Sequence, residues 1–282
     1  MIKNMSSVTQ KMNVEGKTIL ITGATGFFGR YITEGFLEAG AKKVVLMGRS
    51  EKLKEQARDL QKKYGKNRVH AFRVDFYDRK KLIGALKNAV KQFKIDALVN
   101  NAFDFSSKTG FNTPSGRFES STFEQWQAAF ESGIYWAVAA TQIVGQQMRK
   151  RKTGSIINIC SMYGHVSPNP DLYRGTAKFN PPTYSVFKAG IQALTRYTAA
   201  FWAEEGVRCN SISPGAFSNL ETVTANSVQA DDPFLNRIRE KTLLGRTGHP
   251  RDLIGAMLFL ASDASSYMTG QTIMIDGGWT VI

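Results

Sequence analysis

Short apolar runs alternate with longer amphipathic stretches along almost the whole chain. Each run holds four to six residues, is rich in valine, isoleucine and leucine, and is bounded by polar or glycine-containing segments. Such runs are typical of strands buried on both faces of a sheet. They predict seven strands, at residues 18–22, 43–47, 69–74, 97–100, 155–159, 208–213 and 272–275.

The stretches between these runs repeat their apolar residues at helical spacing. The clearest predict helices at residues 51–64, 80–93, 123–149 and 184–205. Parallel strands need crossover connections, and helices at this spacing supply them. We therefore expect one doubly wound α/β domain, with a parallel seven-stranded sheet, helices on both faces and ligands at the carboxyl ends of the strands.

No repeat, low-complexity tract or proline- and glycine-rich linker divides the 282 residues. We expect an N-terminal extension at residues 1–15 and a single domain at 16–282. The glycine-, serine- and threonine-rich stretch 104–121 predicts a long surface loop. A composition of 42% hydrophobic and 21% charged residues is globular and excludes a disordered or collagen-like chain.

Two cysteines, Cys160 and Cys209, are too few for a disulfide scaffold and have no zinc-type spacing. The longest apolar runs, such as residues 254–261, are far shorter than the ~20 residues of a membrane helix. Residues 1–16 are polar and lack the apolar centre of a secretory signal. These features predict a cytoplasmic protein with no membrane segment and no metal site.

The net charge of +14 is concentrated in one part of the chain. Residues 42–94 hold 17 lysines and arginines against 5 acidic residues, which is +12, and leave +2 elsewhere. Such a segment could attract nucleic acid, an acidic membrane or a phosphorylated ligand. No stacking aromatics are interleaved with the charges, so we favour two lysine-rich helices facing water and expect no nucleic-acid partner.

A glycine-rich turn follows the first predicted strand and opens a helix. Glycines at this place let the backbone turn tightly and approach a pyrophosphate, which then meets the N-terminus of the helix. The turn therefore predicts a dinucleotide site, although a tight turn without a ligand would look the same. Its candidate cofactor residues are Gly23, Thr25, Gly26, Phe28 and Gly29.

The end of the second strand bears on which dinucleotide is bound. An acidic residue there would bind the ribose 2′-hydroxyl of NAD, whereas an arginine accommodates the 2′-phosphate of NADP. Gly48 removes the acid and Arg49 supplies the cation, so NADP(H) is favoured and NAD(H) remains an alternative. Arg49 could instead be one more exposed cation of the basic segment.

Two further pairs end the third and fourth strands at the same edge of the sheet. Asp75 and Phe76 follow the third strand, and Asn101 and Ala102 follow the fourth. Short polar side chains at strand ends can meet an adenine or simply order a turn. Both pairs are candidate cofactor contacts.

Tyr184 and Lys188 are four residues apart on a predicted helix and therefore share one face. An ammonium beside a phenol favours the phenolate and lowers a pKa that starts near ~10. Such a tyrosine can pass a proton to or from a carbonyl or alcohol oxygen. Ser161 follows the fifth predicted strand, where its hydroxyl could hold the same oxygen.

Together these residues resemble the short-chain dehydrogenase/reductase family over residues 16–279. The resemblance implies a Rossmann-type domain and an enzyme that uses a nicotinamide cofactor. The matching motifs are the glycine turn, Asn100-Asn101-Ala102, Ser161, Tyr184-Ser185-Val186-Phe187-Lys188, Pro214-Gly215, and Thr269-Gly270-Gln271 through Asp276-Gly277-Gly278.

The resemblance also implies roles for single residues. Tyr184 matches the general acid/base, Lys188 the residue that holds the nicotinamide ribose and lowers the tyrosine pKa, and Ser161 the serine that orients the substrate oxygen. The carboxamide contact would come from Pro214, Gly215 and Phe217, with Asn219 where the family often has threonine. The helix that carries Tyr184 forms a dimer contact in the family, which implies a homodimer or homotetramer.

The chain departs from the compact branch of the family at three places. Gly133 stands where compact members commonly carry an asparagine of a proton relay. The middle glycine of the turn, Gly26, is spaced as in the larger branch that acts on nucleotide sugars. Ser161 and Tyr184 lie 23 residues apart, about ten more than in compact members.

Only 94 residues follow Lys188, which suits the compact branch. We therefore expect a compact enzyme with an enlarged polar lid at about residues 162–183 and a substrate loop at about 216–245. The lid residues expected to face the substrate are His165, Asn169, Asp171, Tyr173 and Arg174.

The expected activity is hydride transfer between a nicotinamide and a secondary alcohol or ketone. The polar lid and the larger-branch features favour a sugar, sugar acid or polyol as the small-molecule substrate. Three alternatives stay open. They are a 3-oxoacyl thioester reductase that docks an acidic carrier protein, a nucleotide-sugar epimerase or dehydratase, and a cofactor-binding regulator with weak catalysis.

Overall fold

The computed structural model describes residues 7–217 and 232–281, so Asn219 and part of the predicted substrate loop lie outside the described residues. A seven-stranded sheet forms its centre, with every neighbouring pair parallel, in the order β3-β2-β1-β4-β5-β6-β7. All seven strands lie within one residue of the predicted bounds, which confirms the doubly wound α/β fold. The strands are β1 (Thr18–Thr22), β2 (Lys43–Gly48), β3 (Val69–Arg73), β4 (Ala97–Asn100), β5 (Gly154–Ile159), β6 (Val207–Pro214) and β7 (Thr272–Ile275).

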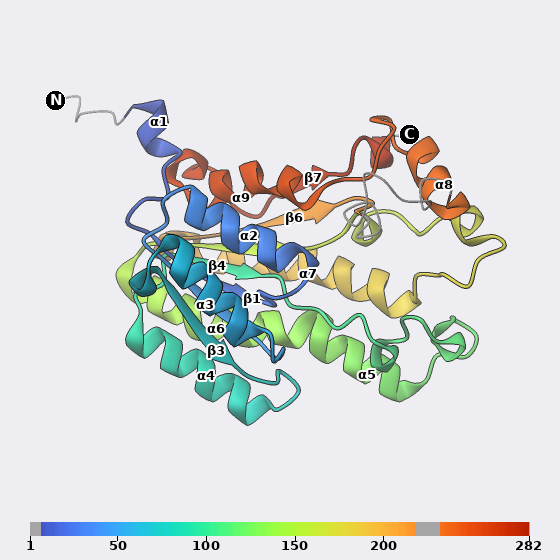
Figure 1. Ribbon diagram of the computed structural model, residues 1–282, viewed down its shortest axis with the longest axis horizontal. Helices are drawn as coiled ribbons and strands as arrows, with labels where there is room; N and C mark the ends of the chain where they lie inside the picture. Colours follow the sequence, from blue (N-terminus) through green and yellow to red (C-terminus); the bar gives the residue numbers. More distant parts are fainter. Residues whose placement is uncertain (1–6, 218–231, 282) are drawn as a thin grey trace.

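Helices cover both faces of the sheet (Figure 1). Along β1, Ile19 and Ile21 join one core while Leu20 joins the other. Successive side chains of a strand point to opposite faces, so an uninterrupted apolar run feeds two cores at once. One face is covered by α2 (Phe27–Glu38), α3 (Leu53–Tyr64) and α9 (Ile254–Ala261), and the other by α4 (Arg79–Gln92), α6 (Trp136–Arg151) and α7 (Pro182–Trp202).

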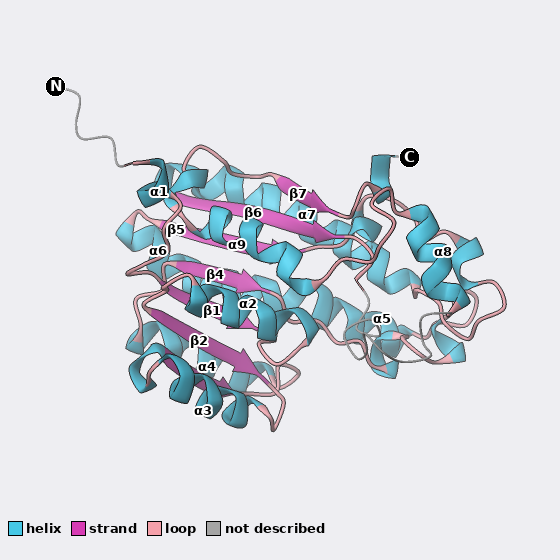
Figure 2. Cartoon of the chain, turned by 45° about the horizontal axis from the view of Figure 1, so that its top comes forward, coloured by secondary structure: helices cyan, strands magenta, loops and turns pink. Residues whose placement is uncertain are grey.

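The strand order reverses between β1 and β4, because β2 and β3 lie on one side of β1 and the later strands on the other. Loops that leave the carboxyl ends of these two strands diverge at such a point and leave a crevice. Figure 2 shows the carboxyl ends of the strands facing α5 (Phe123–Phe130) and α8 (Pro233–Lys241). The topology therefore places ligand-binding loops at this edge.

The predicted helix at 123–149 is confirmed as a continuous helical stretch, but its middle is π-helical rather than α-helical. It divides into α5, a π-helical segment over Glu131–Tyr135, and α6. Gly133 lies in the π-helical segment. Its poor intrinsic helix propensity permits this interruption, which periodicity alone does not reveal.

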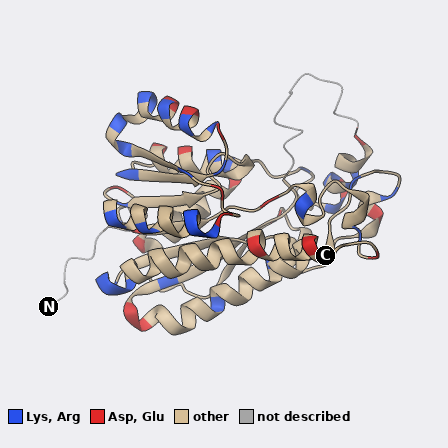
Figure 3. Ribbon diagram, turned by 90° about the horizontal axis from the view of Figure 1, so that it is seen from below, with Lys and Arg blue, Asp and Glu red and all other residues tan. Residues whose placement is uncertain are grey.

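Lysines of the basic segment lie on the outer faces of α3 and α4, where Figure 3 shows their positions in blue. Lys54 and Lys62 of α3 and Lys87 of α4 are exposed, while Leu60 and Leu86 on the same helices are buried. This amphipathic arrangement is that of two ordinary surface helices. Among the described residues, no helix combines the length and apolarity that crossing a bilayer requires.

Candidate active site

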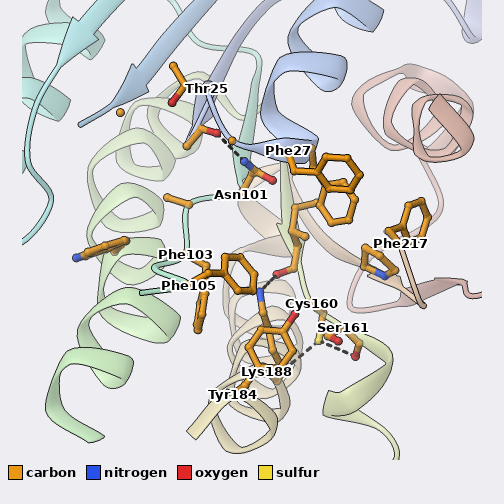
Figure 4. Close-up of a pocket in the computed structure, with 18 of the residues that line it drawn as sticks. Thr25, Phe27, Asn101, Phe103, Phe105, Cys160, Ser161, Tyr184, Lys188 and Phe217 are labelled. Atoms are coloured by element: carbon orange, nitrogen blue, oxygen red, sulfur yellow. Dashed lines mark hydrogen bonds between the residues drawn. The ribbon is translucent and has the colours of Figure 1, made fainter. Parts of the chain in front are cut away.

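A cavity of about 590 Å³ opens at the carboxyl edge of the sheet and extends from the glycine turn to Tyr184 (Figure 4). Of the residues predicted for the site, most line this one cavity. Those residues are Gly23, Thr25, Gly26, Phe28, Arg49, Phe76, Asn101, Ala102, Ser161, Tyr184, Lys188, Pro214, Gly215 and Phe217.

Gly29 and Asp75 are predicted cofactor residues that do not belong to the cavity lining. Gly29 lies under the turn, where a Cβ atom would overlap the carbonyl oxygen of Gly23. It allows α2 to pack closely against the turn. Asp75 is exposed, and its Oδ1 accepts a hydrogen bond of 3.1 Å from the backbone N–H of Tyr77. Its carboxylate orders a turn in this structure.

Gly23 of the turn leaves no room for a side chain of its own. Gly23 has φ of +66°, and a Cβ atom there would lie 2.8 Å from Cα of Ala102. Gly26 caps the N-terminus of α2 in an extended conformation. The open backbone and the free N–H groups at the start of α2 fit a pyrophosphate.

Asn101 ties the end of β4 to the turn. Its Nδ2 donates to the carbonyl oxygens of Thr22 at 3.1 Å and Gly23 at 3.0 Å. The Thr22 hydroxyl in turn accepts hydrogen bonds from the backbone N–H groups of Asn101 and Ala102. These bonds hold the two loops of the crevice at a fixed separation, so Asn101 shapes the cavity as well as lining it.

Arg49 reaches the cavity from the end of β2 and is held by a buried carboxylate. Its Nη2 lies 2.8 Å from Oδ1 of Asp104, whose side chain is 1% exposed. Tyr77 donates its hydroxyl to the same carboxylate at 2.8 Å. Burial opposes ionisation, but the hydrogen bonds from Tyr77 and Arg49 keep the pKa of Asp104 below its usual value. Arg49 itself stays about half exposed, at 48%, and presents a positive charge to the cavity.

The opposite wall of the cavity follows β6. Gly215 is packed so closely that a Cβ atom would lie 2.5 Å from Cα of Asp276. Phe217 contacts the ring of Phe28 edge to face, with centroids 5.2 Å apart. The contact brings the loop after β6 against the first turn of α2.

Ser161, Tyr184 and Lys188 meet at the other end of the cavity. Ser161 follows β5, and the other two residues lie one turn apart on α7. The Nζ of Lys188 donates to the carbonyl oxygen of Ile159 at 2.8 Å and lies 5.5 Å from the ring centroid of Tyr184. The arrangement places a hydroxyl, a phenol and an amine around one point.

The expected direction of the Tyr184 pKa is wrong for this structure. Burial raises the pKa of Tyr184 to about 12, and hydrogen bonding to Ser161 opposes the rise without cancelling it. Burial also lowers the pKa of Lys188 to about 8. Loss of hydration is therefore the main influence on the pKa of both groups. At neutral pH the phenol is protonated, as a proton donor must be.

Gly133 faces the core next to α7. A Cβ atom at this position would lie 2.8 Å from Cβ of Phe187 and 3.3 Å from the ring of Phe103. The volume that an asparagine side chain would need is already filled by the aromatic ring of Phe187. The packing therefore accounts for a glycine at this position.

Gly133→Asn should lower Tm by roughly 5 °C, because overpacking a filled core costs about 1–3 kcal/mol. Differential scanning fluorimetry of the purified protein measures the shift. Gly84→Asn is the matched control, since the exposed Gly84 has open space at its Cβ position and should lose no stability. An equal Tm for wild type and Gly133→Asn would contradict the packing argument.

The predicted lid does not face the cavity in the described residues. Asp171 and Arg174 pair with each other on the surface, and the Asn169 side chain caps the short helix Pro170–Tyr173. His165 has its Nε2 3.0 Å from Oγ of Ser213 on β6, and Tyr173 has its hydroxyl 3.4 Å from that of Tyr163. None of these five side chains lines the cavity, so a contact between them and the substrate stays a prediction.

The insertion packs against α8 instead. Arg237 of α8 donates to the carbonyl oxygens of Leu172 and Arg174, and Lys178 pairs with Asp232 at 2.9 Å. Leu172 also joins a small apolar cluster with Leu235 and Ile238 of α8. Long-range contacts of this kind are invisible to local sequence patterns, which show only that the insertion is polar.

Several cavity residues were missed by the sequence patterns. Phe103 and Phe105 directly follow the Asn100-Asn101-Ala102 motif, so their place after a central strand was the available signal. The other cavity residues that were not predicted are Phe27, Gly48, Ser50, Trp136, Ile159 and Cys160, and of these only Trp136 lies away from the glycine turn and the strand ends. No group of three potential metal ligands occurs in the described part of the chain.

Known proteins resemble this chain over nearly its full length. The family model described as enoyl-(acyl carrier protein) reductase matches residues 23–280. Sorbose reductase of Schizosaccharomyces pombe is 32% identical, over 96% of this chain and 99% of the relative. The 3-oxoacyl-[acyl-carrier-protein] reductase of Thermotoga maritima is also 32% identical, over 96% and 100%.

A solved structure agrees with these relatives. A gluconate 5-dehydrogenase from Burkholderia cenocepacia, in complex with NADP and tartrate, superposes with a TM-score of 0.79 at 26% identity and covers 97% of this chain and 98% of that one. The extent of the family match, together with the fold, establishes the class of protein. The chain belongs to the short-chain dehydrogenase/reductase family of oxidoreductases.

Proposed function

We propose that the protein is an NADP(H)-preferring oxidoreductase that interconverts a secondary alcohol and a ketone on a sugar, sugar acid or polyol. The observation that carries the proposal is the convergence of Ser161, Tyr184 and Lys188 at one end of a cavity that begins at the glycine turn. The substrate class is supported by the names of the relatives, a sorbose reductase and a gluconate 5-dehydrogenase.

The residues of the cavity fit a nicotinamide dinucleotide. The backbone cradle at Gly23 and Gly26 is too close for side chains and suits the pyrophosphate. Arg49, which lies beyond a strand end without an acidic residue, would hold a 2′-phosphate, and Asp104 orients its guanidinium. Asn101, Ala102, Phe76, Pro214, Gly215 and Phe217 would complete the walls around the cofactor.

A nicotinamide dinucleotide held by the glycine turn, Arg49 and the residues along β6 would supply the hydride for reduction of a carbonyl carbon. The Ser161 hydroxyl donates a hydrogen bond to the carbonyl oxygen, and Tyr184 gives that oxygen its proton. The ammonium of Lys188, fixed by the Ile159 carbonyl, stabilises the tyrosinate that remains. A ketone, a hydride and a proton thus yield an alcohol.

The pH dependence of kcat/KM should follow the protonation of the Lys188 amine. Its amine has a pKa of about 8, so the ammonium is present below this pH and is lost as the pH rises through it. Tyr184, with a pKa of about 12, stays protonated over the same range. The kcat/KM for NADPH-dependent reduction should therefore be level below about pH 7.5 and fall above pH 8. A level profile up to pH 10 would contradict the assignment.

We propose a homodimer or homotetramer assembled through the exposed faces of α5 and α7. Tyr197 and Phe201 of α7 are 62% and 64% exposed and stack on each other at 4.4 Å, and Phe123 of α5 is 76% exposed. Large apolar side chains rarely gather on a surface that stays in water.

We place the protein in the cytoplasm, because its two cysteines are both unpaired and buried.

A 3-oxoacyl thioester reductase is a second candidate. The observation that favours it is the Thermotoga maritima relative, which is as identical to this chain as the sorbose reductase is. Oxidation of NADPH is followed at 340 nm with ketoses, keto-sugar acids and 3-oxoacyl thioesters to separate the two. Turnover of a thioester with none on any sugar would replace the proposed substrate class.

A further inference from the structure

Three phenylalanines surround the ring of Tyr184. The ring centroids of Phe103, Phe105 and Phe111 lie 5.2, 5.8 and 5.5 Å from its centroid. All three come from the loop that follows β4. No residue of this loop after Ala102 was predicted to belong to the site. The polar loop predicted from composition thus supplies an aromatic wall next to the proton donor.

Phe105 is the ring of this wall that a ligand can reach most freely. It is 56% exposed, lines the cavity and is drawn beside Tyr184 and Lys188 in Figure 4. Phe103 and Phe111 pack against it with centroids 4.7 and 5.1 Å away. Neighbouring rings restrict its rotation, so little side-chain entropy remains to be lost when a ligand binds.

The two charged residues that line the cavity both have partners. Lys188 donates to the carbonyl oxygen of Ile159, and Arg49, beyond the glycine turn, is paired with Asp104. In the insertion, Asp171 pairs with Arg174, and Lys178 pairs with Asp232 at the start of α8. Of the residues that line the cavity beside Ser161 and Tyr184, Phe103 and Phe105 supply apolar surface, and the two hydroxyl groups supply polar contacts.

We propose that the substrate carries its carbonyl or alcohol carbon within a saturated ring, as in a cyclic polyol, and that this ring lies on Phe105. A saturated ring presents a face of C–H bonds, which the negative face of an aromatic ring attracts. An open-chain ketose must instead order several rotatable bonds on the same surface and lose their entropy. This inference rests on the proposed function and narrows its substrate class.

Two substrates of matched size test the proposal. One is a pentahydroxycyclohexanone and the other a ketohexose, which have the same number of carbons and hydroxyl groups apart from ring closure. The kcat/KM with NADPH should be at least about tenfold higher for the ring ketone. Phe105→Ala should reduce this value about tenfold, mainly through KM, and change the ketohexose value less than about threefold.

Phe118→Ala is the matched control, because Phe118 lies on the same loop, is 73% exposed and does not line the cavity. It should leave both substrates unchanged. Phe105→Tyr keeps the ring and should retain the preference for the ring ketone, which separates loss of stacking from general damage to the loop. Should Phe105→Ala not fold, Phe105→Leu removes the aromatic face with less loss of volume and is judged by the same ratio.

The outcomes distinguish this inference from the proposed function. A preference for the ketohexose, or an equal loss on both substrates in Phe105→Ala, would overturn the ring assignment while leaving the oxidoreductase in place. If no ketone were turned over, although fluorescence titration showed that NADPH still binds, the proposed function and the ring assignment would be overturned together.

Discussion

Tyr184→Phe should lose about a thousandfold in kcat for ketone reduction while its affinity for NADPH changes less than threefold. The substitution removes the hydroxyl that gives the proton and keeps the ring that packs against Phe103. Positioned proton transfer contributes about 10²- to 10⁴-fold to such reactions. Single-turnover oxidation of NADPH measures the chemical step, and fluorescence titration measures binding.

Tyr163→Phe is the control for this experiment. Tyr163 also carries a buried hydroxyl, 3.4 Å from that of Tyr173, but it does not line the cavity. The control should keep most of the activity. If Tyr184→Phe retained more than a tenth of the wild-type rate, another group would have to supply the proton, and the assigned role of Tyr184 would be lost.

Arg49→Ala should weaken the binding of NADPH about tenfold to a hundredfold and that of NADH less than threefold. A hydrogen bond between a guanidinium and a phosphate contributes about 1.5–3 kcal/mol, which corresponds to this range. NADH lacks the 2′-phosphate, so the substitution removes no such contact from its complex. Kd values for both cofactors come from titration of nicotinamide fluorescence.

Arg58→Ala tests whether any cation of the basic segment would have the same effect. Arg58 is exposed on α3 and does not line the cavity. Long-range effects of surface charge are screened by salt, so at about 0.15 M ionic strength this control should hardly change NADPH binding. Equal losses in the two variants, or equal losses for NADPH and NADH in Arg49→Ala, would reduce Arg49 to part of the general positive field.

Much of the fold followed from local pattern. Residues 44–47 form a continuous apolar run because β2 is buried on both faces, and all four of them are buried. The glycine turn was equally readable, since the positive φ of Gly23 and the close packing at Gly29 each demand a residue without a side chain. Tyr184 and Lys188 were paired by helical spacing alone.

Other features depend on segments far apart in the chain. Arg49 meets Asp104 across 55 residues, and Gly133 is explained only by Phe187 beside it. The raised pKa of Tyr184 comes from burial by several elements, whereas the sequence shows only the lysine one turn away. Asp171 and Arg174 form an ion pair with each other, and the carbonyl oxygen of Arg174 accepts a hydrogen bond from Arg237 of α8, none of which the local sequence indicates.

The sequence by itself determined the parallel sheet and the glycine turn, and it singled out Ser161, Tyr184 and Lys188 as candidates, because each feature is carried by a local motif. Only the tertiary structure showed that these three residues line one cavity. It also showed that the polar insertion packs against α8 and that Phe103, Phe105 and Phe111 surround Tyr184. The physical reason is that a loop is positioned by contacts with distant elements, which leave no periodic trace in its own sequence.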